Sequence, residues 1–228
     1  MDKSLVKDIF EWDTENWSKA LPFWEAMLES APSANLSCLE LGSNKGGLSL
    51  WLALKGHHVL CSDYVNPEPN ASALHEKYKV TQLIQYLQID ALNISYKEKF
   101  DVVVFKSILG GISRNNQNQL KKQVIEQIYN SLKPGGMILF AENLSASSMH
   151  KYFRRKFVSW GKDWNYLKLD ELPDLFSKFS SFEYKTLGFL GLLGRNELQR
   201  KFLGKIDNLL APLIPPSASY ILVAVAKK

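Results

Sequence analysis

The stretch Cys38-Leu-Glu-Leu-Gly-Ser-Asn-Lys-Gly-Gly47 decides the fold class, because an apolar strand ends there and passes through glycines into a helix. Glycine is needed where a backbone adopts positive φ or approaches a ligand closely, and Gly42 and Gly46 stand four residues apart. A dinucleotide-binding loop would carry another glycine between them for the pyrophosphate, and this chain lacks it. Glu40 at the strand end suits a cationic amino-acid ligand better than a phosphate.

Strands and helices alternate along the chain around this loop. Hydrophobic patterning predicts strands at 36–41, 58–62, 82–88, 101–105, 137–142, 182–187 and 218–226, and helices at 18–30, 45–54, 71–78, 117–132, 169–179 and 197–213. The apolar run Val102-Val-Val-Phe105 indicates a central strand that is buried on both faces. Such alternation implies a Rossmann-like, doubly wound α/β fold, with a mostly parallel sheet and helices on both faces.

A second acid follows the next predicted strand. Asp63 lies 23 residues beyond Glu40, near the distance at which α/β nucleotide sites place a ribose-binding carboxylate. Together with this acid, Glu40-Leu-Gly42-Ser-Asn-Lys-Gly46 resembles the first motif of the class I S-adenosylmethionine-dependent methyltransferases. The resemblance implies that the Asp63 carboxylate accepts hydrogen bonds from both ribose hydroxyls of the cofactor.

Three further motifs extend the resemblance over roughly residues 35–142. They are Gln88-Ile-Asp90-Ala91 for adenine, Asp101-Val-Val-Val-Phe-Lys106-Ser107 beside the methyl donor, and Leu132-Lys-Pro-Gly-Gly136 before strand five. The resemblance implies S-adenosylmethionine as the cofactor and the class I methyltransferase fold, a seven-stranded sheet whose last strand is antiparallel. The cofactor-binding residues that it implies are Glu40, Gly42, Ser43, Asn44, Gly46, Asp63, Tyr64, Asp90, Ala91, Lys106 and Ser107.

No shift in composition marks a linker, so we expect one methyltransferase domain over residues 1–228. Its expected parts are an N-terminal helical lid (1–34), a cofactor-binding core (35–142), a substrate-covering insert (143–181) and C-terminal strands with an amphipathic helix (182–228). The apolar stripe along 197–213 is expected to pack on its own domain. A homodimer face and a membrane-surface helix are the alternatives.

The segment from His150 to Lys168 points to an anionic acceptor. Six basic residues and one acid give it a charge of +5, which leaves the rest of the chain balanced. Arginine binds phosphate or carboxylate through two parallel hydrogen bonds, and aromatic rings stack on sugars or bases. A solvated surface and a nucleic-acid-binding surface are the alternatives, and the modest charge argues against DNA. The predicted substrate-binding residues are Arg154, Arg155, Trp160, Trp164 and Tyr166.

The predicted acceptor atom is an oxygen. Lys106-Ser-Ile-Leu-Gly110 stands where enzymes that methylate adenine, cytosine or glutamine nitrogens carry an Asn/Asp-Pro-Pro-aromatic turn. Residues 12–25 and 154–173 also resemble bacterial methyltransferases of surface-polysaccharide biosynthesis, as in O-antigen and lipopolysaccharide. That resemblance implies methyl transfer to a hydroxyl of a sugar, nucleotide-sugar or glycan. An RNA methyltransferase and a non-catalytic S-adenosylmethionine-binding protein are the alternatives.

A hydroxyl acceptor must lose its proton, usually to a histidine, glutamate or aspartate. Glu142 and His150 are the candidates, because both follow strand five on the side where open α/β sheets bind ligands. No Asp, His or Cys cluster has metal-ligand spacing, so no metal is expected. The sequence also lacks a signal-peptide pattern and an apolar run of about 18 residues, which predicts a cytoplasmic protein.

Overall fold

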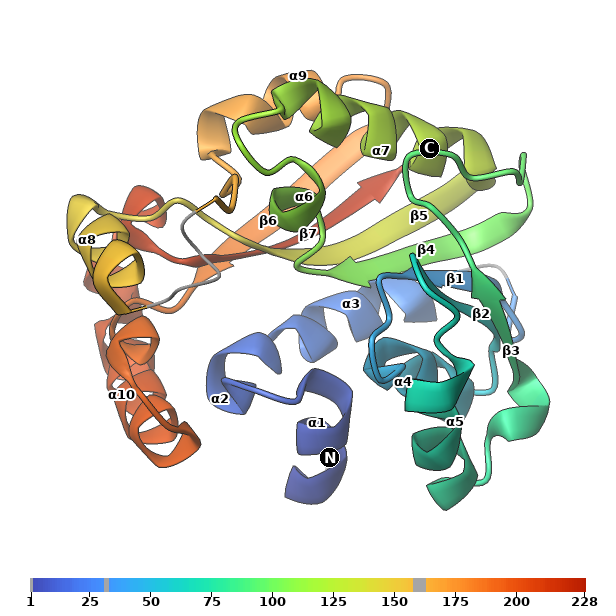
Figure 1. Cartoon of the computed structure of the whole chain (residues 1–228), viewed down its shortest axis with the longest axis horizontal. Coiled ribbons are helices and arrows are strands. Elements are labelled where there is room, and N and C mark those ends of the chain that lie inside the picture. Colours follow the sequence, from blue (N-terminus) through green and yellow to red (C-terminus); the bar gives the residue numbers. More distant parts are fainter. Residues whose placement is uncertain (1, 31–32, 158–162) are drawn as a thin grey trace.

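The computed structural model describes residues 2–30, 33–157 and 163–228. Its centre is a seven-stranded sheet in the order β3-β2-β1-β4-β5-β7-β6 (Figure 1). The strands are β1 (Ser37–Leu41), β2 (His58–Asp63), β3 (Ile84–Gln88), β4 (Phe100–Lys106), β5 (Leu132–Asn143), β6 (Ser181–Leu187) and β7 (Ile221–Lys227). Strand β7 runs antiparallel to β5 and β6, and the remaining neighbours pair in parallel. The predicted sheet, with its antiparallel last strand, is confirmed.

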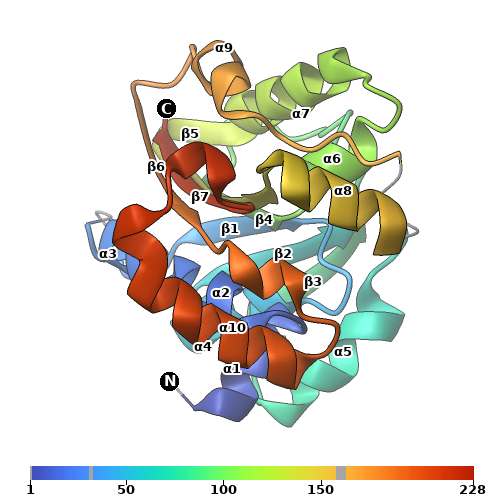
Figure 2. The same ribbon diagram turned by 90° about the vertical axis from the view of Figure 1, so that its left-hand side faces the viewer.

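Helices cover both faces of this sheet. One face carries α1 (Lys3–Phe10), α2 (Thr14–Trp17), α3 (Ala20–Glu29), α4 (Gly47–Leu54) and α5 (Glu68–Lys77) (Figure 1). The other carries α6 (Leu109–Ile112), α7 (Asn118–Ser131) and α9 (Leu172–Leu175). Helices α8 (Ser148–Phe157) and α10 (Glu197–Leu210) lie at one end, which faces the viewer in Figure 2. Short 3-10 turns occupy Thr81–Leu83, Leu169–Glu171, Leu190–Leu193, Ala211–Leu213 and Pro216–Ala218.

The sheet separates two apolar cores. Along β4, Val102 and Val104 pack into the core that includes α3 and α4, whereas Val103 and Phe105 pack into the core that includes α7. Side chains alternate between the two faces of a strand, so a strand that is apolar at every position is covered on both sides. The carboxyl end of β4 is therefore held firmly from both faces, which fixes the residues that follow it.

Helix α1 rests directly on the first turn of α4. A Cβ atom added to Gly47 would collide with the main-chain carbonyl of Ile9, so only glycine permits this approach. Ile9 and Phe10 are buried in the core that this contact closes. The contact brings the residues after Phe10 to the carboxyl edge of the sheet.

Hydrophobic patterning does not predict α8, where an irregular segment is expected. Within the described side chains of α8, the buried ones include His150 and Arg154, which are 0% and 4% exposed. A pattern that counts apolar residues misses a helix whose inward face is polar. The functional consequence is that α8 directs charge toward the interior of the protein.

The prediction that the apolar stripe at 197–213 packs on its own domain is wrong for four of its residues. Those residues, each 66% to 81% exposed, are Leu198, Phe202, Leu209 and Leu213. The buried positions of α10 are Gly204 and Asp207. A Cβ atom on Gly204 would lie 2.8 Å from the Glu15 side chain, so α10 packs through its smallest residue and close to α2.

Candidate active site

Two adjoining cavities lie at the carboxyl ends of the parallel strands. The larger has a volume of about 630 Å³ and the smaller about 380 Å³. Residues that line both are Gly42, Ser107, Ile108 and Trp164. Open α/β sheets bind their ligands at this edge, and the volumes are those of small-molecule sites.

The loop after β1 borders both cavities and needs its glycines. Gly42 has φ +64° and Gly46 has φ +71°, in the left-handed region that favours glycine. A Cβ atom on Gly42 would lie 2.5 Å from Ile108 Cγ2, and one on Gly46 would lie 2.6 Å from the His75 ring. Backbone conformation and available space therefore both require glycine at these positions, as the motif predicts.

Four predicted cofactor-binding residues line the smaller cavity and not the larger one: Asp63, Tyr64, Asp90 and Ala91. Asp63 ends β2, and its carboxylate accepts hydrogen bonds from the backbone N–H groups of Asn44 (2.8 Å) and Tyr64 (2.7 Å). Each carboxylate oxygen has further lone pairs for a ligand hydroxyl. Asp90 accepts a hydrogen bond from the Leu92 N–H at 2.9 Å, which fixes the turn after β3.

The predicted cofactor-binding residues in the larger cavity are Glu40, Gly42, Ser43, Asn44, Lys106 and Ser107. Gly46 belongs to neither lining, and its neighbour Gly47 contributes instead. The buried Glu40 carboxylate accepts hydrogen bonds from the N–H groups of Ser49 (2.8 Å) and Leu48 (3.3 Å) in the first turn of α4. Burial raises the pKa of Glu40 to about 7. Glu40 thus ties α4 to β1 while it forms part of the cavity wall.

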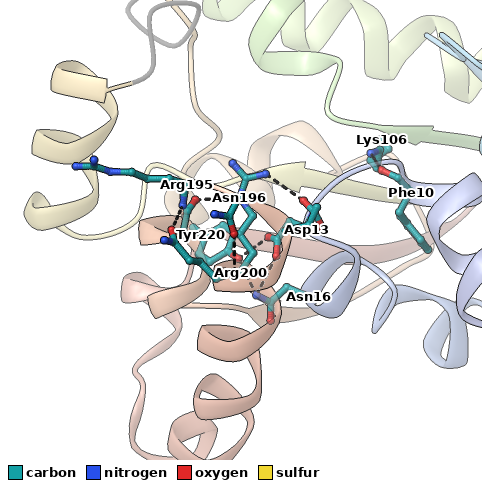
Figure 3. A network of polar contacts seen from close by, with 11 residues as sticks. Phe10, Asp13, Asn16, Lys106, Arg195, Asn196, Arg200 and Tyr220 are labelled. Atoms are coloured by element: carbon teal, nitrogen blue, oxygen red, sulfur yellow. Dashed lines mark hydrogen bonds and ion pairs between the residues drawn. The ribbon is translucent and has the colours of Figure 1, made fainter.

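Lys106, at the end of β4, faces the N-terminal segment (Figure 3). Its Nζ donates to the main-chain carbonyl of Phe10 at 2.8 Å. The rings of Phe10, Trp12 and Trp17 have their centroids 5.0 to 5.9 Å from this nitrogen. Burial lowers the pKa of Lys106 to about 8. The lysine therefore joins the end of α1 to the carboxyl end of β4.

Asp13 is a buried carboxylate in the larger cavity that the sequence pattern does not reveal. Its side chain is 2% exposed. The Tyr220 hydroxyl donates to Asp13 Oδ2 at 2.5 Å, and Asn16 Nδ2 donates to Asp13 Oδ1 at 3.3 Å and to Tyr220 at 2.8 Å (Figure 3). Burial raises the pKa of Asp13 to about 6, against the opposing effect of these donors. A carboxylate with this pKa in a ligand-sized cavity is suited to accept a proton at neutral pH.

The local sequence around Asp13 is typical of a helix N-cap. Aspartate just before a helix usually accepts a hydrogen bond from the first turn, but Asp13 has φ 46° and makes no such bond. Its backbone N–H donates instead to Glu197 Oε1 at 2.7 Å, and Glu197 pairs with Arg200 at 3.2 Å. Its side-chain partner Tyr220 lies 207 residues away in the sequence, so no local signal marks the site.

The structure does not bring Glu142 and His150, the predicted bases, to either cavity. The Glu142 carboxylate is fully buried and accepts hydrogen bonds from the N–H groups of Leu109 (2.8 Å) and Asn143 (3.0 Å). His150 Nε2 donates to the Phe189 carbonyl at 2.7 Å, which leaves Nδ1 as the acceptor for the Ser147 hydroxyl. Both side chains are committed to protein groups, so their positions do not fit the predicted role.

Glu142→Gln is expected to lower the free energy of unfolding by about 1 to 3 kcal/mol, because the new amide nitrogen faces a backbone donor. Burial raises the pKa of Glu142 to about 7, so the comparison belongs at pH 8, where the carboxylate is ionised. Denaturant unfolding followed by circular dichroism measures the change. A variant with wild-type stability but weakened cofactor binding would contradict the structural role.

Three of the predicted substrate-binding residues line the larger cavity: Arg154, Trp164 and Tyr166. The side chain of Arg155 and the whole of Trp160 lie outside the described residues. The Trp164 indole packs so closely on α6 that a Cβ atom on Gly110 would collide with it. Because Trp164 lines both cavities, it stands at their junction.

Residues 39–140, from β1 to β5, match the protein family described as a methyltransferase domain. The match makes this segment similar to a methyltransferase domain, over a little less than half of the chain. This match supports the resemblance to the class I methyltransferases, and a domain of that family implies S-adenosylmethionine as the cofactor, as the motifs predict. No curated protein sequence matches the chain.

Solved structures share the fold of this chain at low sequence identity. Phosphoethanolamine N-methyltransferase 2 of Haemonchus contortus, crystallised with phosphomonomethylethanolamine and S-adenosylhomocysteine, has a TM-score of 0.62 and 16% identity. The match covers 93% of this chain and 52% of that protein, so this chain spans about half its length. A SAM-dependent methyltransferase from Methanosarcina mazei has a TM-score of 0.58 and 16% identity, over 89% of this chain and 96% of that one.

Another similar structure shows why the fold alone does not fix the reaction. The [4+2]-cyclase SpnF has a TM-score of 0.59 and 12% identity, over 91% of this chain and 80% of that one.

Within residues 2–30, 33–157 and 163–228, no helix combines the length and apolar character needed to cross a membrane. The described residues also contain no group of three His, Cys, Asp or Glu side chains arranged to hold a metal ion.

Proposed function

We propose that this chain transfers a methyl group from S-adenosylmethionine to an oxygen atom of a small-molecule acceptor in the larger cavity. The observation that carries the proposal is the pair of adjoining cavities, one with the carboxylates expected around an adenosine and one with a buried carboxylate of pKa about 6. Two ligands bound in these cavities would meet beside Gly42 and Ser107, which line both. Methyl transfer requires such a meeting of donor and acceptor.

The residues around the smaller cavity fit an adenosine group. Asp63 offers acceptor lone pairs to two ribose hydroxyls, and Ile89 and Ala91 supply apolar surface for a planar base. The glycine loop leaves its backbone exposed where the amino-acid part would lie, next to the acid Glu40. The residues that line the two cavities thus suit the base, the ribose and the amino-acid part of S-adenosylmethionine.

The chain's own residues align the acceptor, hold its proton and exclude water. S-adenosylmethionine, when bound, would supply a methyl group on a positively charged sulfur. The acceptor oxygen attacks the methyl carbon in line with the carbon–sulfur bond, and the sulfur is the leaving group. Asp13 accepts the hydroxyl proton of the acceptor at Oδ1, because Tyr220 already donates a short hydrogen bond to Oδ2. Asn16 and Tyr220 hold this carboxylate in place. Trp164 covers the junction of the cavities and keeps water from it.

A hydroxyl of a sugar, nucleotide-sugar or glycan is the proposed acceptor group. Trp12, Trp164 and Tyr166 line the larger cavity, and aromatic rings pack well against the apolar faces of sugars. Incubation with a panel of sugar phosphates, sugar acids and nucleotide-sugars, followed by mass spectrometry, identifies the acceptor by the added methyl group. A methyl group found on nitrogen and on no oxygen of these compounds would contradict the oxygen acceptor.

Calorimetric titration tests the cofactor part of the proposal. S-adenosylmethionine and S-adenosylhomocysteine are expected to bind with dissociation constants of about micromolar order, a free energy near 8 kcal/mol. ATP and NAD⁺ are the controls, since the loop lacks the extra glycine of a pyrophosphate site, and they are expected to bind at least about 100-fold more weakly. Preference for either control, or no binding of S-adenosylhomocysteine, would overturn the proposal.

A further inference from the structure

Arg154 is a buried cation without a carboxylate partner. Its side chain is 4% exposed, and Nη1 donates to the main-chain carbonyls of Leu144 (2.6 Å) and Ser145 (3.3 Å). Within the part of the chain that the structure describes, Nη2 has no hydrogen-bond partner, and no acidic side chain pairs with this guanidinium. The remaining residues, 1, 31–32 and 158–162, contain no aspartate or glutamate.

A buried, unpaired guanidinium such as that of Arg154 favours binding of an anion from outside the chain. Buried charges in proteins are almost always paired, because a cation taken out of water without a counterion is strongly unfavourable. Carbonyl oxygens satisfy one arm of the guanidinium and leave its charge uncompensated. The unpartnered Nη2 belongs to a side chain that lines the larger cavity, so a ligand there can reach it.

Tyr166 and Arg200 add a hydroxyl donor and a second positive charge at the same end of the cavity, although Arg200 also pairs with Glu197. The Tyr166 ring lies 4.0 Å from the Arg154 guanidinium carbon, and its hydroxyl is buried without a hydrogen-bond partner among the described residues. Arg200 also lines the larger cavity. Arg154 and Arg200 continue into a neighbouring cavity of about 440 Å³ that Arg195 completes. Figure 3 shows Arg195 and Arg200 beside the Asp13 network.

We propose that Arg154, Arg200 and Tyr166 form a binding site for an oxyanion carried by the acceptor, a phosphate or a carboxylate. This inference rests on the proposed function, because it assigns one end of the larger cavity to the acceptor. The planar guanidinium of Arg154 presents parallel N–H donors to two oxygens of one anionic group. An acceptor bound there lies in the same cavity as Asp13. The site therefore favours acceptors that carry both an anionic group and a hydroxyl.

Inorganic pyrophosphate is the probe for this site, titrated by calorimetry into protein saturated with S-adenosylhomocysteine. Arg154→Gln is expected to weaken pyrophosphate binding at least about tenfold, through loss of a charged hydrogen-bond donor pair. Lys151→Gln is the matched control, since it removes the same charge from the exposed side of α8 and is expected to change affinity less than about twofold. Equal pyrophosphate affinity in wild type and Arg154→Gln would overturn the proposal.

The carboxylate of the cofactor is the other possible source of an oxyanion, and the same titrations separate the two. Under the proposal, S-adenosylhomocysteine affinity is unchanged in Arg154→Gln and pyrophosphate does not compete with it. Competition, together with weaker S-adenosylhomocysteine binding by the variant, would assign Arg154 to the cofactor and overturn the acceptor site.

Two further measurements keep the test independent of folding and of the cofactor. If Arg154→Gln fails to fold, Tyr166→Phe removes only a hydroxyl and is expected to weaken pyrophosphate binding about threefold. Wild-type affinity in Tyr166→Phe would then overturn the site. If S-adenosylhomocysteine does not bind the wild type, the proposed function fails, and titration of cofactor-free protein with pyrophosphate still decides whether the anion site exists.

Discussion

Asp13→Asn is expected to lower kcat for methyl transfer by about 10²- to 10⁴-fold, the range that a positioned general base contributes. The amide keeps the size of the carboxylate and still accepts a hydrogen bond from Tyr220, but it cannot take a proton from the acceptor. KM is expected to change less than about threefold, because the lost interaction belongs to the transition state. The rate of S-adenosylhomocysteine formation with the acceptor identified by the screen gives both constants.

The pH dependence of the wild-type rate follows from the same carboxylate. Burial raises the pKa of Asp13 to about 6, and only the ionised form accepts a proton. The rate is therefore expected to fall about tenfold for each pH unit below 6 and to level off above about pH 7. Carbon-13 NMR of labelled aspartate measures this pKa directly and needs no acceptor.

Stability is expected to respond to Asp13 in the opposite direction from catalysis. Because the pKa in the folded protein lies above the unfolded value of 3.8, the folded state binds the proton more tightly. The resulting stabilisation is complete below about pH 4 and is lost as the pH rises through about 6. Ionised Asp13 thus destabilises the fold at pH 8, and Asp13→Asn is expected to be at least as stable there as the wild type.

Glu142→Gln is the matched control for the catalytic assignment. Burial also raises the pKa of Glu142, to about 7, but this side chain lies outside both cavities. The variant is expected to lose stability and to retain kcat within about threefold. If Asp13→Asn keeps the wild-type kcat, or if Glu142→Gln loses as much as Asp13→Asn does, Asp13 is not the base.

The cavity proposed for the cofactor could be predicted from the sequence because each of its features is local. A glycine with positive φ, such as Gly42, and an acid at a strand end, such as Asp63, are fixed by their neighbours in the chain. Parallel strands place their carboxyl ends along one edge, so motifs separated by about 20 residues meet there without further information. The seven strands and the antiparallel β7 follow from the family resemblance.

The cavity proposed for the acceptor depends on contacts that no local pattern encodes. Asp13 meets Tyr220 and the Glu197–Arg200 pair only through tertiary packing, in which α2 lies against α10. The position of Glu142 outside both cavities has an equally simple cause. Successive residues of a strand point to opposite faces, and Asn143, not Glu142, is the member of this pair that lines the larger cavity.

Asp63→Ala is expected to weaken S-adenosylmethionine and S-adenosylhomocysteine binding about 100-fold. Two hydrogen bonds between a carboxylate and the ribose hydroxyls are lost, each worth about 1.5 kcal/mol or more. Asp63→Asn keeps one acceptor oxygen and is expected to lose about tenfold. Glu76→Ala, which removes an exposed acid from α5, is the control and is expected to bind both ligands like the wild type.

A second route to weak binding must be separated from the loss of ribose contacts, because Asp63 also accepts the Asn44 N–H and so shapes the glycine loop. Calorimetry with a 2′-deoxy analogue of S-adenosylhomocysteine makes the distinction. If Asp63 binds the ribose, the analogue loses affinity for the wild type and loses little more for Asp63→Ala, since the two changes remove the same interaction. If Asp63 acts through the loop alone, the two losses add, and wild-type affinity in Asp63→Ala would remove this residue from the cofactor site altogether.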